Sequence, residues 1–328
     1  MWAAEPSFGR GAAAPSVKSG TVAERRKGAY SVNTREIQNK KQRILIYLLV
    51  LIPFLYFLYI MVYPLGVSVY YSLTKWKGIG SPKFVGLANY KTLVKSGDFW
   101  LVTKNTLFLS LVCTIGQVGI ALIIAFLMTL RRLRFKAFHR AVIFFPVVMS
   151  ALVVGYVWRF IYNSNYGLLN TFLNFIGKPE WIRLWLDDQS IVLKSVSVPV
   201  VWQYIGLYMV ILMSAISAIP QDIFECAEID GATGFKKSIY ITLPMIWNSL
   251  KVCIILCAGG TMKIYDHLVA LTNGGPGRAS ESLAMYCYEF TFRFGNFGMG
   301  AAIAVAILVF ALLISGVIQL LMGRRESE

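Results

Sequence analysis

The sequence predicts an all-α membrane protein, a six-helix transmembrane bundle with both ends of the chain in the cytoplasm. Its 328 residues are 57% hydrophobic and only 15% charged, and their mean hydropathy is +0.61. This composition leaves too little polar surface to cover a soluble domain of that size. Uncharged stretches recur along the chain at about the 20-residue length that crosses a bilayer as a helix. The basic residues gather at the ends of these stretches, which is typical of membrane topology.

The expected spans follow from the uncharged stretches. Five of them reach or nearly reach the required length, at 44–74, 105–130, 141–158, 195–221 and 294–323. A sixth span is expected at 252–271, although Lys263 and Asp266 interrupt it, because a side chain that faces the bundle can be charged where one that faces lipid cannot. Pro53 and Pro64 lie inside the first span and predict a kink there.

Charge decides the orientation. Basic residues are dense before the first span and in the 131–140 loop, and Arg324 and Arg325 follow the last span, so both termini are expected in the cytoplasm. The lysines of the 75–104 loop oppose this orientation, but the 131–140 loop is denser in positive charge. Topology thus accounts for the net charge of +16, and no nucleic-acid partner is expected. We divide the chain into a basic cytoplasmic N-terminal tail over 1–43, a transmembrane domain over 44–323 and a short C-terminal tail over 324–328.

A charged, glycine-containing segment at 218–245 interrupts the hydrophobic chain between the fourth and fifth spans. Pro220 and Asp222 signal a helix start, and Gly231 permits a backbone turn that a side chain would obstruct. A second helical or extended stretch then runs to Pro244, which is expected to close it. The pattern predicts a cytoplasmic helix-turn-helix, and an ordinary amphipathic surface loop is the alternative.

The stretch ECAEIDGATGFKKSIYITLP at 225–244 closely resembles the cytoplasmic E-A-A, D-G-A, I-x-L-P motif of permease subunits of binding-protein-dependent ABC importers. Cys226 replaces the usual second alanine. A second stretch, YDHLVALTNGGPGRASESLAMYCYEFTF at 265–292, resembles the corresponding segment of maltose-type sugar permeases, as do FVGLANY at 84–90 and NYGLLN at 165–170. The resemblance covers roughly residues 43–325.

This resemblance implies that the 218–245 segment is an EAA-type coupling loop, whose helix docks on a cytoplasmic ATPase. The residues it assigns to coupling are Glu225, Ala227, Glu228, Asp230, Gly231, Ala232, Leu243 and Pro244. It also implies two copies of an ATP-binding subunit that hold ATP and Mg²⁺, a second homologous permease and an extracytoplasmic substrate-binding protein. The chain itself is then expected to bind no cofactor or metal, to catalyse no reaction and to pass a sugar across a bacterial cytoplasmic membrane.

Aromatic and polar side chains on the third, fourth and fifth spans suggest where a sugar passes. The expected pathway residues are Tyr156, Trp158, Trp202, Gln203, Tyr204, Tyr208, Lys263 and Asp266. For each aromatic the alternative is packing or an interface belt. Lys263 and Asp266, at i and i+3, either pair with each other, or Lys263 faces the pathway and with Arg159 favours an acidic sugar.

Two other functions are open. A membrane-embedded enzyme requires a catalytic cluster, but His139 and His267 are the only histidines, and no H-E-x-x-H or G-x-S-x-G motif accompanies them. A secondary transporter or channel without an ATPase often shows inverted repeats, and the sequence contains no internal repeat that we detect. The importer interpretation alone gives the 218–245 segment a purpose.

Overall fold

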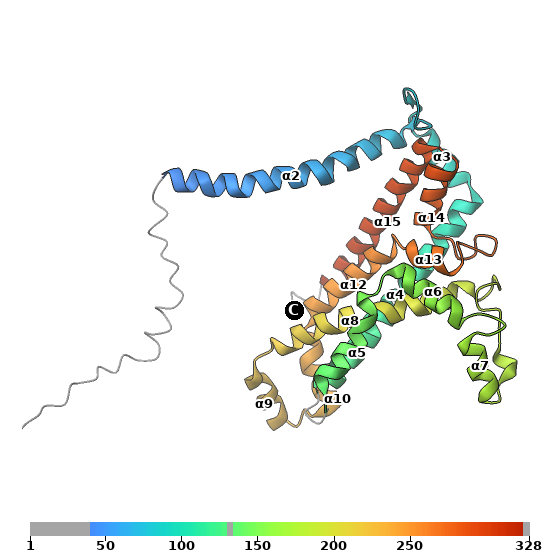
Figure 1. Ribbon diagram of the computed structural model, residues 1–328. Helices are drawn as coiled ribbons and strands as arrows, with labels where there is room; N and C mark the ends of the chain where they lie inside the picture. Colours follow the sequence, from blue (N-terminus) through green and yellow to red (C-terminus); the bar gives the residue numbers. More distant parts are fainter. Residues whose placement is uncertain (1–39, 130–133, 324–328) are drawn as a thin grey trace, which may run out of the picture. The chain divides into compact units, whose positions relative to one another are not determined.

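The computed structural model describes residues 40–129 and 134–323, with side chains from Ile44 onward (Figure 1). The basic tail over 1–39, Arg131 and Arg132 of the basic loop, and the C-terminal tail over 324–328 lie outside the described residues. The chain divides into two compact units, Met1–Pro64 and Leu65–Glu328. The first unit, within the described residues, is the first part of helix α2.

Helix α2, Lys40–Ser72, covers all but the last two residues of the first expected span, 44–74, and continues without interruption through Pro53 and Pro64. A small antiparallel hairpin follows it, in which β1 (Thr74–Lys75) pairs with β2 (Lys83–Phe84). Helix α3, Ala88–Lys95, comes next. The buried amide of Asn89 donates to the carbonyls of Ser72 and Thr74, so it ties α3 to the start of the hairpin.

Helices α4 (Gly97–Thr129) and α8 (Val192–Ser217) pack along each other at the centre of the second unit. Buried side chains such as Met128 and Leu212 form a hydrophobic core between these helices and helix α12, Trp247–Thr261. Pro199 lies inside α8 and has no N–H, so the carbonyl of Ser195 lacks its usual helical partner. The hydroxyl of the buried Tyr162 donates to that carbonyl at 3.0 Å.

The third expected span is broken, which the sequence analysis did not foresee. Helix α5 (Lys136–Val148) and helix α6 (Ala151–Ile161) meet at a 99° bend. Met149 and Ser150 between them are extended, and the Ser150 hydroxyl caps α6 by accepting from the N–H of Val153. Pro146 near the end of α5 cannot donate a helical hydrogen bond, which weakens the helix where it ends.

The span expected at 252–271, which is the fifth of the six in chain order, is also not one helix. Helix α12 (Trp247–Thr261) ends before Lys263, and helix α13 (Asp266–Leu271) begins after it. Helix α13 lies directly against α6, since a Cβ atom added to Gly155 would come within 2.5 Å of the Ala270 Cβ. The two broken spans therefore bring their short helices together. Between α6 and α8 in the sequence lie helix α7 (Leu168–Phe175) and a 3-10 turn, η1 (Pro179–Trp181).

The segment after α13 carries an ion-pair cluster. Arg278 Nη1 contacts Glu281 Oε2 at 2.6 Å and Glu289 Oε2 at 2.8 Å, and Arg278 Nε lies 3.6 Å from Asp98 Oδ2 on α4. Burial raises the pKa of the Glu281 carboxyl above its usual range, and the Arg278 guanidinium opposes the shift. The cluster fastens this loop to the start of α4.

The last elements of the described residues are helix α14 (Leu283–Tyr288), the π-helical turn η3 (Glu289–Arg293) and helix α15 (Phe297–Gly323). A separate hydrophobic core joins them to α4 through buried residues that include Phe99, Leu283 and Ile303.

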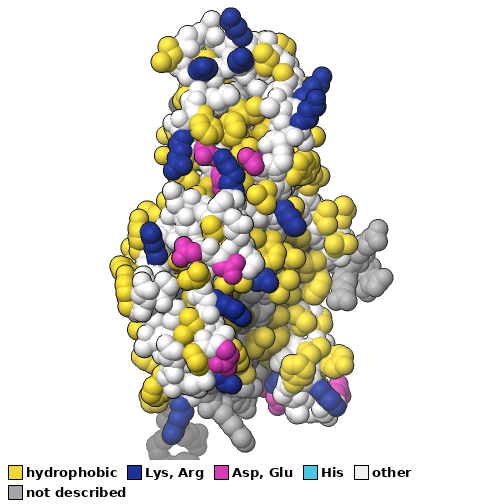
Figure 2. Space-filling model, turned by 90° about the vertical axis from the view of Figure 1, so that its right-hand side faces the viewer, with side chains coloured by type: hydrophobic (Ala, Val, Ile, Leu, Met, Phe, Trp, Pro, Cys, Tyr) yellow, Lys and Arg dark blue, Asp and Glu magenta, His cyan; other side chains and the backbone are white. Residues whose placement is uncertain are grey.

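The described residues contain four helices long and apolar enough to cross a membrane, or six spans if each of two bent helix pairs counts as one. The predicted all-α bundle is confirmed, with six as the upper count. The second bent pair joins Gly234–Met245 to Trp247–Thr261, so its span lies earlier in the chain than the expected 252–271. Figure 2 shows hydrophobic side chains exposed over much of one face, as expected for helices that contact lipid.

Candidate functional site

The 218–245 segment begins with helix α9, Gln221–Ile229. Its end is a Schellman motif, in which the N–H of Ala232 donates to the carbonyl of Ala227 and the N–H of Gly231 to that of Glu228. Gly231 has a φ of +79°, the left-handed conformation that this motif requires. The turn expected at Gly231 is therefore present, and Ala227 is buried beneath it.

The second part of the segment differs from the expectation. Helix α10 (Gly234–Lys237), the π-helical turn η2 (Ser238–Thr242) and helix α11 (Leu243–Met245) follow one another, so Pro244 lies inside helical structure and does not close it. In the π-helical turn the N–H of Leu243 donates to the carbonyl of Ser238, which shifts the hydrogen-bond pattern just before the proline that cannot donate. The chain bends by 74° between Met245 and Trp247, ahead of α12.

The acidic residues of the segment have separate local roles. Glu228 pairs with Lys237 at 2.7 Å across the Gly231 turn, Glu225 accepts from Gln221, and Asp230 is the C-cap of α9. Phe224 packs against the core of α4, α8 and α12, and Leu243 does the same from the other side of the turn. The segment is thus a braced unit attached to the bundle.

Three large apolar side chains of the same segment are open to solvent. Ile229, Phe235 and Tyr240 are 85%, 77% and 72% exposed. Sequence reasoning did not single them out, since an apolar residue in an amphipathic helix is usually expected to face the core. Exposed apolar side chains grouped on one structured segment are typical of a protein interface.

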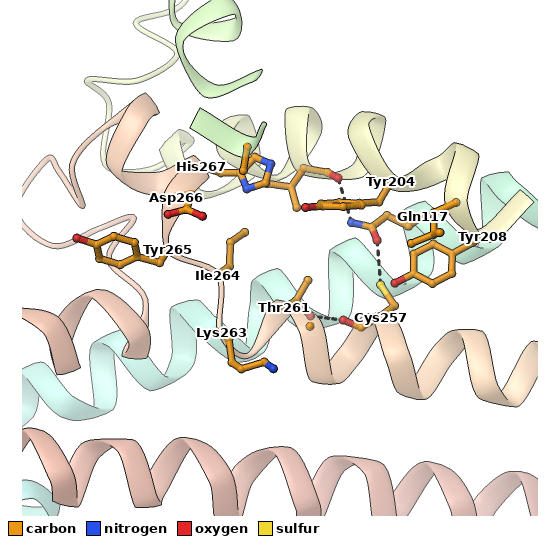
Figure 3. Close-up of a pocket in the computed structure, with 14 residues that line it drawn as sticks. Gln117, Tyr204, Tyr208, Cys257, Thr261, Lys263, Ile264, Tyr265, Asp266 and His267 are labelled. Carbon is orange, nitrogen blue, oxygen red and sulfur yellow. Dashed lines mark hydrogen bonds between the residues drawn. The ribbon is translucent and has the colours of Figure 1, made fainter. Parts of the chain in front are cut away.

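A cavity of about 280 Å³ lies between α4, α8, α12 and α13, at the break in the fifth expected span (Figure 3). Four of the expected pathway residues line it: Tyr204, Tyr208, Lys263 and Asp266. The structure adds further lining residues, which include Gln117, Cys257, Thr261, Tyr265 and His267. The volume is just below the roughly 300 Å³ at which small-molecule sites usually begin.

The wall of the cavity is held by a chain of buried polar contacts. The Gln117 side chain donates from Nε2 to the carbonyl of Val200 on α8 and accepts from the Cys257 thiol on α12. The Thr261 hydroxyl donates back to the carbonyls of Cys257 and Ala258 in the last turn of α12. Such contacts satisfy polar groups that would otherwise be costly at membrane depth.

Lys263 and Asp266 do not share a helix, because Lys263 lies in the break and Asp266 is the first residue of α13. Both side chains are exposed, and the described residues include no ion pair between the two. In Figure 3 they lie apart, with Ile264 between them. Of the two alternatives for these residues, the i, i+3 pairing is absent from the described structure, because the helix that it assumed is interrupted there.

The other expected pathway residues lie away from the cavity lining. Trp158 packs edge-to-face with Trp202, with ring centroids 5.9 Å apart, and Tyr156 is 51% exposed. Gln203 is buried behind the cavity wall and is 1% exposed. Arg159 lines a separate pocket with Asp187 and Asn273, so it does not join Lys263 in the cavity.

The polar cavity residues that sequence reasoning missed include Gln117, Cys257, Thr261 and His267. An amide in the middle of an otherwise apolar span was the available signal for Gln117, since it requires a partner at that depth. For His267 the signal was its position beside Asp266.

Residues 117–326 match the family model described as "Binding-protein-dependent transport system inner membrane component". The chain is 33% identical to a probable ABC transporter permease protein, YurN, of Bacillus subtilis, over 81% of this chain and 92% of that one. It is 30% identical to the trehalose/maltose transport system permease protein MalF of Thermococcus litoralis, over 75% of this chain and 81% of that one.

The fold resembles a chain in the crystal structure of a bacterial ABC transporter involved in the import of the acidic polysaccharide alginate. The TM-score is 0.74 at 20% identity, and the match covers 87% of this chain and 96% of that one. The family match and the long apolar helices both indicate a multi-pass protein of the cytoplasmic membrane. The chain belongs to the family of binding-protein-dependent transport system inner membrane components.

Proposed function

We propose that this chain is the permease subunit of an ATP-driven importer for a sugar or oligosaccharide, and that its cavity forms part of the pathway. The observation that carries the proposal is the cavity itself, in which Tyr204, Tyr208 and Tyr265 lie among amide, hydroxyl and charged side chains. Aromatic rings suit the apolar faces of a sugar, and the polar groups suit its hydroxyls. The Thermococcus litoralis relative, a trehalose/maltose transport system permease protein, supports the same substrate class.

The charge of the cavity favours a neutral sugar over an acidic one. Lys263 and Asp266 both line it, so one cation and one anion balance each other, and Arg159 lies in a different pocket. The cavity is also small for an oligosaccharide. A second, homologous permease is therefore proposed to complete the pathway from the opposite side.

We further propose that the 218–245 segment faces the cytoplasm and docks on an ATP-binding subunit, of which the importer holds two copies. Ile229, Phe235 and Tyr240 supply an exposed apolar surface for that contact. The Schellman turn, the Glu228–Lys237 ion pair and the packing of Phe224 into the core make the segment rigid enough to pass on domain motion. ATP and Mg²⁺ bind in the partner subunit, and an extracytoplasmic binding protein delivers the sugar.

Copurification tests this proposal. The tagged chain is extracted from its own membrane in mild detergent, and the proteins retained with it are identified by mass spectrometry. We expect an ATP-binding subunit and a second permease at fixed ratios to this chain. Replacing Phe235 and Tyr240 with serine should release the ATP-binding subunit and retain the second permease. A chain that retains no ATPase and still supports sugar uptake would be a secondary transporter, and one that modifies a lipid or sugar would be a membrane-embedded enzyme.

A further inference from the structure

One buried side chain connects the breaks in the two broken spans. Gln203 on α8 donates from Nε2 to the carbonyl of Met149 at 2.7 Å, in the extended link between α5 and α6. Its Oε1 accepts from Nε2 of His267, in the first turn of α13 just after the other break. Gln203 and His267 are 1% and 4% exposed. Both hydrogen-bonding ends of the amide are therefore occupied, one by each broken span.

The contact with Met149 answers a specific need. Since α5 ends at Val148 and α6 begins at Ala151, the Met149 carbonyl belongs to neither helix. A backbone carbonyl at membrane depth that lacks a partner is costly, because no water is available to replace the missing helical N–H. The amide of Gln203 supplies the missing donor from α8, which packs along α4 at the centre of the second unit.

The short helices that follow the two breaks are packed closely against each other. A Cβ atom on Gly155 of α6 would come within 2.5 Å of the Ala270 Cβ and 3.3 Å of the His267 carbonyl oxygen. On the other side of the break, a Cβ atom on Gly206 of α8 would come within 2.4 Å of the Ile143 carbonyl oxygen on α5. Helix α5 thus packs directly against α8, and helix α6 packs directly against α13.

Each of the three residues in this hydrogen-bond chain, Met149, Gln203 and His267, is also within two positions in the sequence of a residue that lines the cavity. Ala151 follows Met149 by two positions, Tyr204 follows Gln203, and Asp266 precedes His267. Figure 3 shows Tyr204, Asp266 and His267 around the same space. The Gln203 contacts thus lie next to wall residues from three helices, α6, α8 and α13.

We propose that Gln203 is a positioning residue for the cavity: its amide holds the breaks of both broken spans against α8 and so determines the spacing of Ala151, Tyr204 and Asp266. The consequence for selectivity rests on the proposed function, since it assumes that the sugar passes through this cavity. Gln203 itself contacts no substrate in this arrangement. Its effect on transport is expected in substrate discrimination as well as in rate.

The test uses one cysteine in the cavity wall of the full chain in its complex. The five native cysteines are replaced, with Cys257→Ser keeping a donor toward Gln117, and Ala151→Cys is introduced. The rate at which a small water-soluble methanethiosulfonate labels this cysteine is compared with and without Gln203→Met, which keeps the side-chain length but makes neither hydrogen bond. Tyr162→Phe is the matched control, because it also frees a buried backbone carbonyl between α6 and α8 but lies outside the cavity lining.

We expect Gln203→Met to raise the labelling rate by about fivefold or more, since an unsatisfied buried carbonyl shifts a conformational equilibrium by roughly that factor. Tyr162→Phe should leave the rate within about twofold. His267→Phe removes only one of the two Gln203 contacts and should give a smaller increase in the labelling rate. If Gln203→Met is absent from the membrane, the labelling rate of His267→Phe is the test of the proposal. An unchanged rate, or the loss of both variants from the membrane, would overturn the proposal.

Sugar is then added to separate the two proposals. In the parent background the transported sugar should slow labelling at position 151, and Gln203→Met should reduce the discrimination between this sugar and a poorer one by a similar factor. If labelling responds to Gln203→Met but sugar never protects the cysteine, the positioning role stands and the proposed pathway fails. If sugar protects but Gln203→Met changes neither labelling nor discrimination, the pathway stands and the positioning role fails.

Discussion

Replacing Gly231 tests the docking segment through backbone conformation alone. Gly231 is the left-handed residue of the Schellman motif, with a φ of +79°, and no atom lies within 4 Å of a Cβ atom added there. The Cβ atom of a leucine at this position therefore meets no steric obstacle, and the left-handed backbone supplies the cost of the substitution. That conformation costs an L-residue roughly 1–2 kcal/mol, which reduces the population of the native turn by about 5- to 30-fold relative to its alternatives.

The assay measures three quantities for each variant: the amount of the chain in the membrane, the ATP-binding subunit that copurifies with it, and sugar uptake per chain. Gly231→Leu should insert normally, because the turn lies outside the hydrophobic spans, but should lose most of its ATPase and its uptake. Gly231→Asn should lose much less, since asparagine tolerates the left-handed conformation. Gly259→Ala is the matched control, because this glycine of α12 also has no atom within 4 Å of an added Cβ but has an ordinary helical φ.

Equal uptake and equal ATPase recovery in Gly231→Leu and Gly259→Ala would refute the reasoning. The 225–244 stretch would then be a surface loop whose conformation does not matter to transport.

The remaining predictions concern topology, the cavity charge and the ion-pair cluster. A single cysteine at Ser238 should react with a membrane-impermeant reagent only when the cytoplasmic side is exposed, and labelling from outside would reverse the proposed orientation. Lys263→Met should leave the amount of protein in the membrane within about twofold, because no ion pair with Asp266 is lost. The same variant should reduce the uptake of neutral and acidic sugars alike. A selective loss of acidic-sugar uptake would instead support a preference for an acidic substrate. Arg278→Met should lower the free energy of unfolding by about 3 kcal/mol at pH 8, since it leaves buried carboxylates without their partner. Because burial raises the folded-state pKa of Glu281, protonation of this carboxyl favours the folded state, so the loss of unfolding free energy in Arg278→Met should shrink as pH falls toward 5. Thermal unfolding at pH 8 and pH 5 measures this difference. An equal loss at both pH values would contradict the role of Arg278 as the partner of a buried carboxylate.

The helical class and the approximate positions of the apolar segments could be predicted because hydrophobic length depends on local composition. Breaks within a span could not, since a window of hydropathy reads Val148 and Ala151 as one apolar stretch although a 99° bend separates their helices. At the bend, the Met149 carbonyl accepts a hydrogen bond from Gln203, which lies far along the chain, and no local window can register such a contact. Likewise the helix assumed for Lys263 and Asp266 gives way to a link between α12 and α13.

The Gly231 turn is the opposite case. Its conformation follows from a glycine just past the end of a helix, a signal confined to a few residues, and the structure shows that turn. The cavity could be predicted in part, because Tyr204 and Tyr208 are recognisable in the sequence as polar aromatic residues on one span. Gln117 and His267 join them only through packing of α4 and α13.

ATP-dependent uptake in liposomes tests the central claim most directly. The chain is reconstituted with its copurifying ATP-binding subunit and second permease, with the cognate binding protein and labelled sugar outside and ATP enclosed. We predict uptake that requires ATP, the binding protein and this chain, and that falls sharply for Tyr204→Ala while the protein stays at its normal level in the membrane. Uptake that proceeds without ATP, or that Tyr204→Ala leaves at the wild-type rate, would contradict the account.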